Sequence, residues 1–250
     1  METLNKVAQI TLLFWIMKII ATTLGETLGD FLSMTLNLGY STSLLITALF
    51  FALTLWIQLG AKDYVPIYFW LVIVATTTLG TEISDFLDRS LHLGYSYGSL
   101  LLLAGLVSTL ALWNKRFRNL NVFPIFQRSK EVYFWIAILF SNSLGTAFGD
   151  FLSDVVNLSY LMGALVTAGI ILMVLALHYF TKINHVLLFW IAFVFTRPFG
   201  ATLGDFLTKP LVNGGLDLGT LPASLVALVL MAILVWMMQR QLLKNAQKAT

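Results

Sequence analysis

The sequence contains no cysteine and has little charge. The absence of cysteine excludes disulfides, thiolate metal ligands and a cysteine nucleophile. Charged residues make up 11% of the 250 residues, whereas an average soluble domain carries about 25%. A soluble protein of this size needs a larger share of polar and charged residues to cover its surface. The net charge of +3 is small, and we expect no nucleic-acid partner.

Apolar stretches long enough to cross a bilayer occur along the whole chain, since a spanning helix needs about 20 mostly apolar residues. The first stretch lacks both a basic leading region and an A-x-A-like cleavage site. We therefore interpret it as a mature helix and not as a signal peptide. The chain, residues 1–250, is expected to form a single membrane domain that lies in the lipid bilayer.

A fixed register of residues occurs four times. Each copy has a Phe-Trp pair, a glycine ten residues after the Trp, and an aspartate fifteen residues after it. The aspartates are Asp30, Asp85, Asp150 and Asp205, each followed by Phe-Leu. We place the repeats at 8–60, 64–114, 129–180 and 184–239, with a linker, 114–130, between the halves. Each repeat holds two apolar spans, so we predict an all-α membrane protein with eight transmembrane helices in a pseudo-symmetric bundle.

Lys and Arg are concentrated at the termini and in the linkers between repeats, while the turns inside the repeats hold only Arg89 and Lys209. Such residues in short loops favour the cytoplasm, so we predict a multi-pass protein with both termini and the linker cytoplasmic. Each repeat has an even number of spans, which makes the four repeats parallel and brings their aspartates to one depth. The repeated Trp and Tyr are expected to be interface anchors, and the glycines to allow close helix packing.

Polar residues line one face of each first helix, at eight, eleven and fifteen residues after the Trp. In the first three repeats they are Thr23, Glu26 and Asp30; Thr78, Thr81 and Asp85; Ser143, Thr146 and Asp150. The fourth repeat has Pro198 and Ala201 before Asp205, with Arg197 beside them. Arg197 is expected to be the one base near the acids and to tune their charge by pairing with Asp205 or a neighbour. Lys18 is expected to reach back to the cytoplasmic interface.

Two interpretations of the aspartates remain open. Each aspartate lies near a helix end, where it can cap backbone N–H groups. Alternatively, the acids bind a cation or protons, because intramembrane carboxylates usually line a cavity or pair with a cation. Glu26 and Glu82 favour the second interpretation, since a cap does not need them. The candidate cation-binding residues are Glu26, Asp30, Glu82, Asp85, Asp150, Asp205, Thr23, Thr78 and Ser143.

Carboxylates and hydroxyls without a thiolate suit hard cations such as Mg²⁺, Mn²⁺ or Ca²⁺. The candidate ligands of such a metal are Glu26, Asp30, Asp85, Asp150 and Asp205. We expect no covalent cofactor, and no pair of histidines is expected to face the membrane interior as haem ligands. We also expect no enzyme, because an intramembrane aspartyl protease needs two aspartates and not a fourfold set, and no H-E-x-x-H motif or phosphate loop is present.

The register from Phe14 to Ser33, Phe-Trp…Thr-Thr-x-Gly-Glu-x-x-Gly-Asp-Phe-Leu-Ser, resembles a family of bacterial membrane proteins made of four tandem repeats of unknown function. The resemblance covers essentially the whole chain, and it implies the architecture and a bacterial inner membrane but no activity. Glu26-x-x-Gly29-Asp30-x-x-Ser33 is also similar to the Glu-x-Gly-Asp-[Lys/Arg]-[Thr/Ser] motif of a Mn²⁺/Ca²⁺–proton exchanger family. Here the spacing differs by one residue and the basic residue is absent.

These observations lead to one functional hypothesis with alternatives. We expect an inner-membrane cation transporter, for a divalent metal, with proton-coupled export as one mode. Metal cations and protons are therefore the expected small partners. A non-transporting membrane scaffold or sensor with capping aspartates is one alternative, and a passive cation channel is another. The oligomeric state and the identity of the ion stay open.

Overall fold

The structure is a computed structural model that describes residues 5–249, with the side chains up to residue 244. Within this part, eight helices are long and apolar enough to cross a membrane, and no strand is present. They are α1 (Leu12–Asp30), α2 (Gly39–Gly60), α3 (Pro66–Asp85), α4 (Gly94–Phe117), α5 (Arg128–Asp150), α6 (Tyr160–Phe180), α7 (His185–Thr208) and α8 (Thr220–Ala249). The predicted all-α membrane fold of four two-helix repeats is confirmed.

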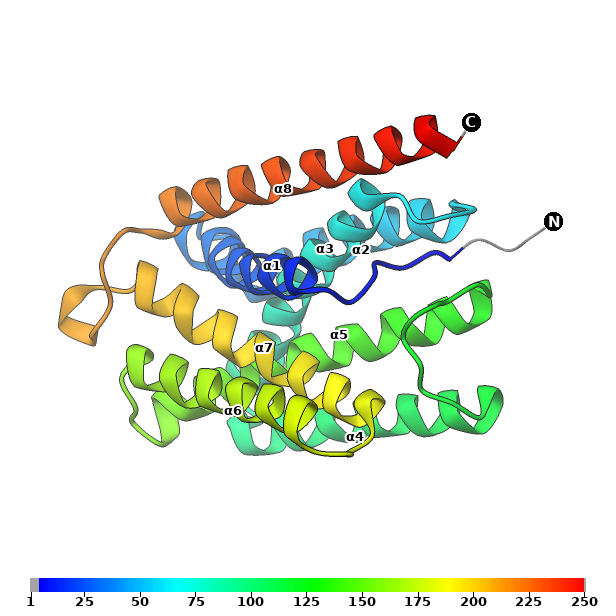
Figure 1. Cartoon of the computed structure of the whole chain (residues 1–250). Helices are drawn as coiled ribbons and strands as arrows, with labels where there is room; N and C mark the ends of the chain where they lie inside the picture. The colour runs from blue at the N-terminus through cyan, green and yellow to red at the C-terminus, as the bar shows by residue number, and fades with distance from the viewer. Residues whose placement is uncertain (1–4, 250) are drawn as a thin grey trace.

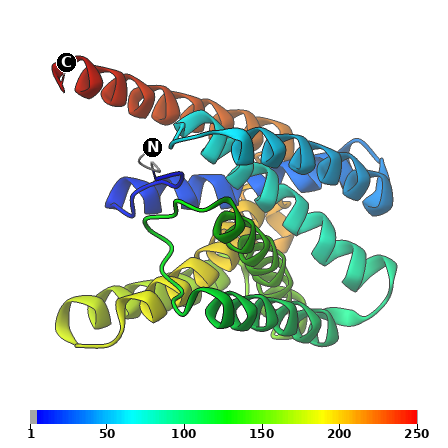
Figure 2. The same cartoon turned by 90° about the vertical axis from the view of Figure 1, so that its right-hand side faces the viewer.

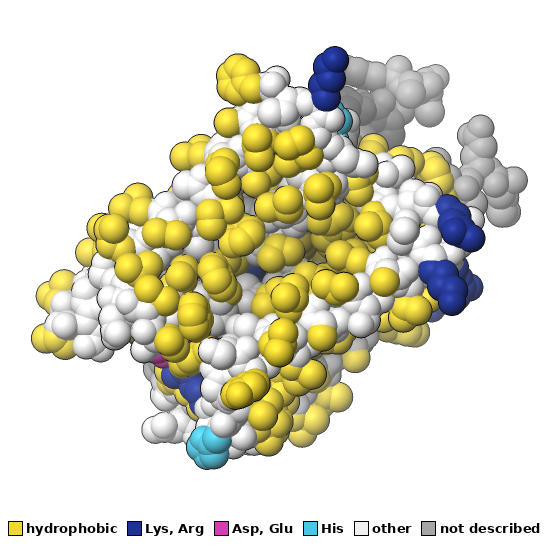
Figure 3. Space-filling model, turned by 90° about the horizontal axis from the view of Figure 1, so that it is seen from below, with side chains coloured by type: hydrophobic (Ala, Val, Ile, Leu, Met, Phe, Trp, Pro, Cys, Tyr) yellow, Lys and Arg dark blue, Asp and Glu magenta, His cyan; other side chains and the backbone are white. Residues whose placement is uncertain are grey.

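The first helices of the four repeats form the inner layer of the molecule. The helices α1, α3, α5 and α7 pack against one another in a closed ring. The second helices lie outside this ring, and their apolar side chains, such as Leu49, Leu100 and Leu172, are exposed. Hydrophobic side chains are spread over the whole face seen in Figure 3, with Lys and Arg mostly toward its edges. Such a surface suits lipid tails, because a bilayer offers no water to polar groups.

Each outer helix packs mainly on the inner helix of another repeat. The main partner of α2 is α3, that of α4 is α5, that of α6 is α7, and α8 packs on α1. The packed pairs are therefore shifted by one helix relative to the sequence repeats, and the contact between α8 and α1 closes the ring. Figure 1 shows both chain ends on the same side, which we call the terminus end, and Figure 2 looks onto it. The turns within the repeats lie at the opposite, turn end.

Glycines set how closely the inner helices approach. The glycine ten residues after each Trp lies against the next helix of the ring, where an added Cβ would overlap its neighbour. The contacts join Gly25 to Thr77, Gly80 to Asn142, Gly145 to Arg197, and Gly200 to Thr22. The predicted packing role of these residues is confirmed, since small residues let helix backbones meet in a membrane.

At the turn end, the inner helices of the first three repeats continue past the aspartate into a π-helical turn. These turns are Phe31–Thr35, Phe86–Ser90 and Phe151–Val155. None of Asp30, Asp85 and Asp150 uses its side chain as a cap there. The capping interpretation of these aspartates is therefore wrong. In the fourth repeat α7 stays α-helical through Asp205 to Thr208, and the inserted segment follows it.

Candidate functional site

The four aspartates lie together at the turn end of the inner ring, as their common register predicted. Each is nearly inaccessible, with 5% or less of its surface exposed. They do not form one symmetric ring of acids, however. Two cationic side chains divide them into two groups, one between α7 and α1 and one between α3 and α5.

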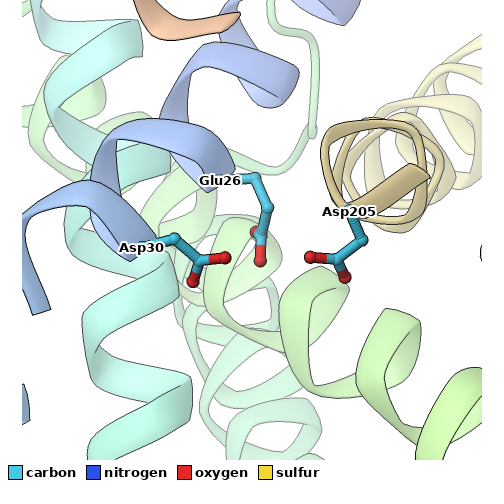
Figure 4. A group of neighbouring side chains, drawn as sticks. All are labelled: Glu26, Asp30 and Asp205. Carbon is cyan, nitrogen blue, oxygen red and sulfur yellow. The ribbon is translucent and has the colours of Figure 1, made fainter. Parts of the chain in front are cut away.

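The first group is formed by Glu26 and Asp30 of α1 and Asp205 of α7. One carboxylate oxygen from each of these residues lies within 4.8 Å of the others, and all three are buried. Figure 4 shows the three carboxylates pointing toward one shared space. We call this group the three-carboxylate cluster.

Lys209 already places a positive charge on the three-carboxylate cluster. Its Nζ lies 2.6 Å from Asp30 Oδ2 and 3.3 Å from Asp205 Oδ1. Burial by itself would lower the pKa of Lys209, but the carboxylates of Asp205 and Asp30 outweigh it and raise the pKa above its ordinary value. The carboxylates therefore favour the ammonium form of Lys209, which lies between Asp30 and Asp205.

The second group is held by Arg89, which lies in the π turn after α3. Its Nε is 3.2 Å from Asp85 Oδ1, and its Nη2 is 3.6 Å from Asp150 Oδ2. Arg89 and Lys209 both stand four residues after the aspartate of their repeat, and each also reaches the aspartate of the next inner helix in the ring, so the two groups are equivalent in the repeat register. The residue equivalent to Glu26 in the second group is Thr146, and among the described residues no third carboxylate joins Asp85 and Asp150.

Arg197 is completely buried and reaches from α7 to α1 and α3. It donates hydrogen bonds to Glu26 Oε2 at 2.9 Å, to the carbonyl oxygen of Thr22 at 3.2 Å, and to the Thr81 hydroxyl. The expectation that Arg197 pairs with an acid is confirmed, but its partner is Glu26 and not Asp205. The expectation that it is the one nearby base is wrong, because Arg89 and Lys209 are closer to the aspartates.

Glu82 is a further buried acid beside the cluster. It is fully inaccessible, and neither carboxylate oxygen has a hydrogen-bond partner among the described residues. Its Oε1 faces α1 at Gly29, where an added Cβ would lie 3.5 Å away. A buried carboxylate without a donor is strongly disfavoured, so this group is more stable when it carries a proton or lies next to a cation.

The structure does not bring the predicted hydroxyl groups to the acids. Thr78 and Ser143 each donate to a carbonyl of their own helix, at 3.0 Å. Thr23 lines an apolar groove with Ile20 and Val226. The stripe that faces the bundle axis passes seven and eleven residues after the Trp, and one residue further along a helix is turned away by about 100°.

Lys18 does not reach back to the membrane surface as expected. It is fully buried, and its Nζ donates to Asn142 Oδ1 at 2.9 Å and lies 4.2 Å from the centre of the Phe193 ring. It escaped the sequence interpretation because a single lysine near the start of an apolar helix is typical of a side chain that reaches the interface. Arg89 and Lys209 had a clearer signal, because each stands one helical turn after an aspartate.

The terminus end of the inner ring is closed by aromatic side chains. Trp70 and Trp135 are fully buried. Their rings lie 5.7 Å from Phe14 and 5.3 Å from Phe69, measured between ring centroids. These tryptophans are core residues, so the expectation that they anchor the protein at the membrane interface is wrong. We call these four residues the aromatic cluster.

One motif of hydrolases occurs at the turn end. Gly94-Tyr95-Ser96-Tyr97-Gly98 has the G-x-S-x-G spacing of a nucleophile elbow. An elbow needs a sharp turn between a strand and a helix. Here the segment forms the first turn of α4 and follows a π turn, with no strand before it. The spacing therefore lacks the geometry that exposes such a serine.

Comparison with known proteins bears on the repeat and not on the chemistry of the site. The family described as Repeat of Unknown Function (DUF347) matches residues 13–64, 68–118, 133–184 and 188–241. The chain belongs to this family. Each DUF347 match covers most of one inner and one outer helix, so the predicted four-repeat resemblance is confirmed. No curated protein and no solved structure matches the chain.

Proposed function

We propose that this protein is a membrane cation transporter that binds a divalent cation between Glu26, Asp30 and Asp205. The observation that carries the proposal is the convergence of these three buried carboxylates on one space. Hard divalent cations bind oxygen ligands at about 2.0–2.6 Å. Ligands on opposite sides of such an ion are therefore about 4–5 Å apart, which agrees with the spacing of 4.8 Å or less between these oxygens.

The ammonium group of Lys209 supports this assignment. A side-chain cation held by Asp30 and Asp205 indicates that the cluster favours positive charge. The Lys209 side chain is 22% exposed. Lys209 follows the last residue of α7, so its ammonium group can move away from Asp30 and Asp205 while the helices stay in place. Mg²⁺, Mn²⁺ and Ca²⁺ are the candidate ions because the donors are carboxylates. When Lys209 withdraws, Asp30, Asp205 and Glu26 are free to hold the ion.

A transporter is favoured over a passive channel by what lies deeper in the bundle. Arg197 places a buried positive charge, and Lys18 a buried amine, between the cluster and the terminus end. Fixed positive charge in a narrow path excludes cations. The aromatic cluster also closes that path. A cation can therefore cross only if the inner helices change their arrangement. Such a change is typical of a transporter, whereas an open pore does not need it.

The location and orientation are part of the proposal. The Lys and Arg residues at the terminus end favour a cytoplasmic position for both chain termini in a bacterial inner membrane. The three-carboxylate cluster then lies near the outer face. In an exporter the cluster would release the cation at the outer face, and in an importer it would bind the cation there.

The proposal is tested by cation flux. Full-length protein in liposomes that contain a Mn²⁺-sensitive dye is compared with the variants Glu26→Gln, Asp30→Asn and Asp205→Asn. We expect each variant to lose most of the Mn²⁺ flux, because it removes one ligand charge. Thr23→Val is the matched control, since Thr23 lies outside the cluster, and its flux should equal that of the wild type. Unchanged flux in all three cluster variants would exclude the assignment.

A non-transporting scaffold or sensor is the second candidate. It is favoured by the ion pairs of Arg89 and Lys209, each of which joins an inner helix of one half of the chain to the other half. This candidate expects the cluster variants to unfold at lower temperature, while Mn²⁺ stabilises neither them nor the wild type. A transporter expects Mn²⁺ to raise the unfolding temperature of the wild type.

A further inference from the structure

Lys18 breaks the repeat at a position that is otherwise apolar. The residues at the same place in the other three repeats, three residues after the Trp, are Ile73, Ile138 and Phe193. Lys18 is fully buried on the inner face of α1. Ionisable residues inside a membrane bundle are disfavoured, and they commonly mark the path of an ion or a proton.

The surroundings of Lys18 contain no compensating acid. Its ammonium group donates to the amide oxygen of Asn142, and Asn142 donates in turn to Thr76 Oγ1 at 3.1 Å, which fixes the direction of the amide. Among the described residues, no carboxylate lies within 4 Å of its Nζ. The facing groups from α3 and α5 are thus uncharged, and the charge that acts on Lys18 from α7 is the positive charge of Arg197.

A short polar connection joins Lys18 to the three-carboxylate cluster. The Thr22 hydroxyl donates to the carbonyl oxygen of Lys18 at 3.0 Å, Arg197 donates to the carbonyl oxygen of Thr22, and Arg197 also binds Glu26. The aromatic cluster lies on the side of Lys18 that faces the terminus end. Lys18 therefore stands between the proposed cation site and the closed terminus end.

Arg197 is the charged group that links the cluster to the surroundings of Lys18. Without a divalent ion, the three carboxylates of the cluster hold the guanidinium group of Arg197 and the ammonium group of Lys209. A divalent cation that replaces the Lys209 ammonium group adds one positive charge on the side of Lys18 that already faces Arg197, and like charges repel strongly in a medium of low dielectric constant. A neutral amine still donates one hydrogen bond to Asn142, so the deprotonated form remains satisfied.

We propose that Lys18 is a proton-binding residue that releases its proton when a divalent cation binds to the three-carboxylate cluster. One N–H bond breaks, the electron pair stays on Nζ, and the proton passes to water. Cation binding and proton release are thereby coupled, as an exchange of a cation for a proton requires. This inference rests on the proposed cation site and names the group that supplies the exchanged proton.

The test measures proton release on Mn²⁺ binding. Purified full-length protein in weakly buffered detergent solution at pH 7 is titrated with MnCl₂. The electron paramagnetic resonance signal of free Mn²⁺ gives the ion bound, and a pH indicator gives the protons released. The variants are Lys18→Met, which has no ammonium group, and Lys18→Arg, whose guanidinium does not lose a proton. Asn142→Asp is a third variant, because a carboxylate beside Lys18 holds it in the ammonium form.

We expect all three variants to bind Mn²⁺ and to release about one proton fewer per bound ion than the wild type. Asn142→Asp keeps Lys18 itself, so the inference stays testable if a substitution at Lys18 prevents folding. If all folded variants bind Mn²⁺ and release as many protons as the wild type, the role of Lys18 is wrong, while the proposed cation site still stands. If the wild-type protein binds no Mn²⁺, the proposed cation site is wrong, and the proposed exchange is wrong as well.

Discussion

Replacement of Lys209 by methionine is expected to increase the affinity for a divalent cation. In the wild type an entering ion must displace the Lys209 ammonium group from Asp30, 2.6 Å away, and from Asp205, 3.3 Å away. A hydrogen bond to a charged group contributes about 1.5–3 kcal/mol net, and about 1.4 kcal/mol corresponds to a tenfold change in affinity. Removal of this competitor should therefore lower the Mn²⁺ dissociation constant by about tenfold to a hundredfold.

Arg89→Met provides a matched control for this substitution. It removes the same charge at the pseudo-equivalent position, but its site has Thr146 where the first has Glu26. We expect little gain in affinity from Arg89→Met, because only two carboxylates are freed there. The assay is the loss of the free Mn²⁺ resonance signal on titration into purified protein. An equal gain in both variants would show that only long-range charge matters, and no gain in Lys209→Met would refute the competition.

The pH dependence of this gain follows from the raised pKa of Lys209. A group with a raised pKa in the folded protein keeps its proton, and its stabilising contact, until the pH rises through that pKa. For Lys209 this point lies above the ordinary value of a lysine. The advantage of Lys209→Met over the wild type should therefore be similar at pH 7 and pH 9.

Three further predictions concern stability, each measured as the midpoint of thermal unfolding in detergent. Gly80→Val should lower the midpoint strongly because its Cβ would press on the backbone of Asn142, whereas Gly169→Val, with open space around its Cβ, should not. Trp135→Ala should cost about 3–5 kcal/mol as a fully buried aromatic, while Trp56→Ala, 68% exposed, should have little effect. Glu131→Gln breaks the buried ion pair with Lys6 and should cost about 3–5 kcal/mol; Lys6→Met combined with it should cost less than the sum of the two single changes.

The sequence predicted the elements of this fold better than their partners. Hydropathy and the Phe-Trp…Asp register were sufficient for eight spans and for the common level of Asp30 and Asp205. They did not reveal that α2 packs on α3, because four similar inner helices offer each outer helix two comparable neighbours. Trp135 was misplaced for a related reason: an aromatic near a helix start has the same pattern whether it faces lipid or the bundle core.

The site was predicted in part. The acids were found because a carboxylate is rare in an apolar span, and the glycines because their spacing is regular. The i,i+4 spacing of Arg89 and Lys209 from Asp85 and Asp205 is visible in the sequence. The sequence does not show that the same two side chains also reach Asp150 and Asp30 on neighbouring helices. The pairing of Arg197 with Glu26 depends on which inner helices are neighbours, and only the closed ring places α7 beside α1.

The shift between packed pairs and sequence repeats has a consequence for shorter forms of the chain. A fragment with only the first two repeats leaves α1 without its outer cover and leaves α4 without an inner partner. In two such fragments these missing contacts are complementary, because α4 of one copy meets a first helix like α5 in the other. We therefore expect two half-length chains to rebuild the ring as a two-fold dimer. The present protein has the architecture expected from the fusion of such a pair.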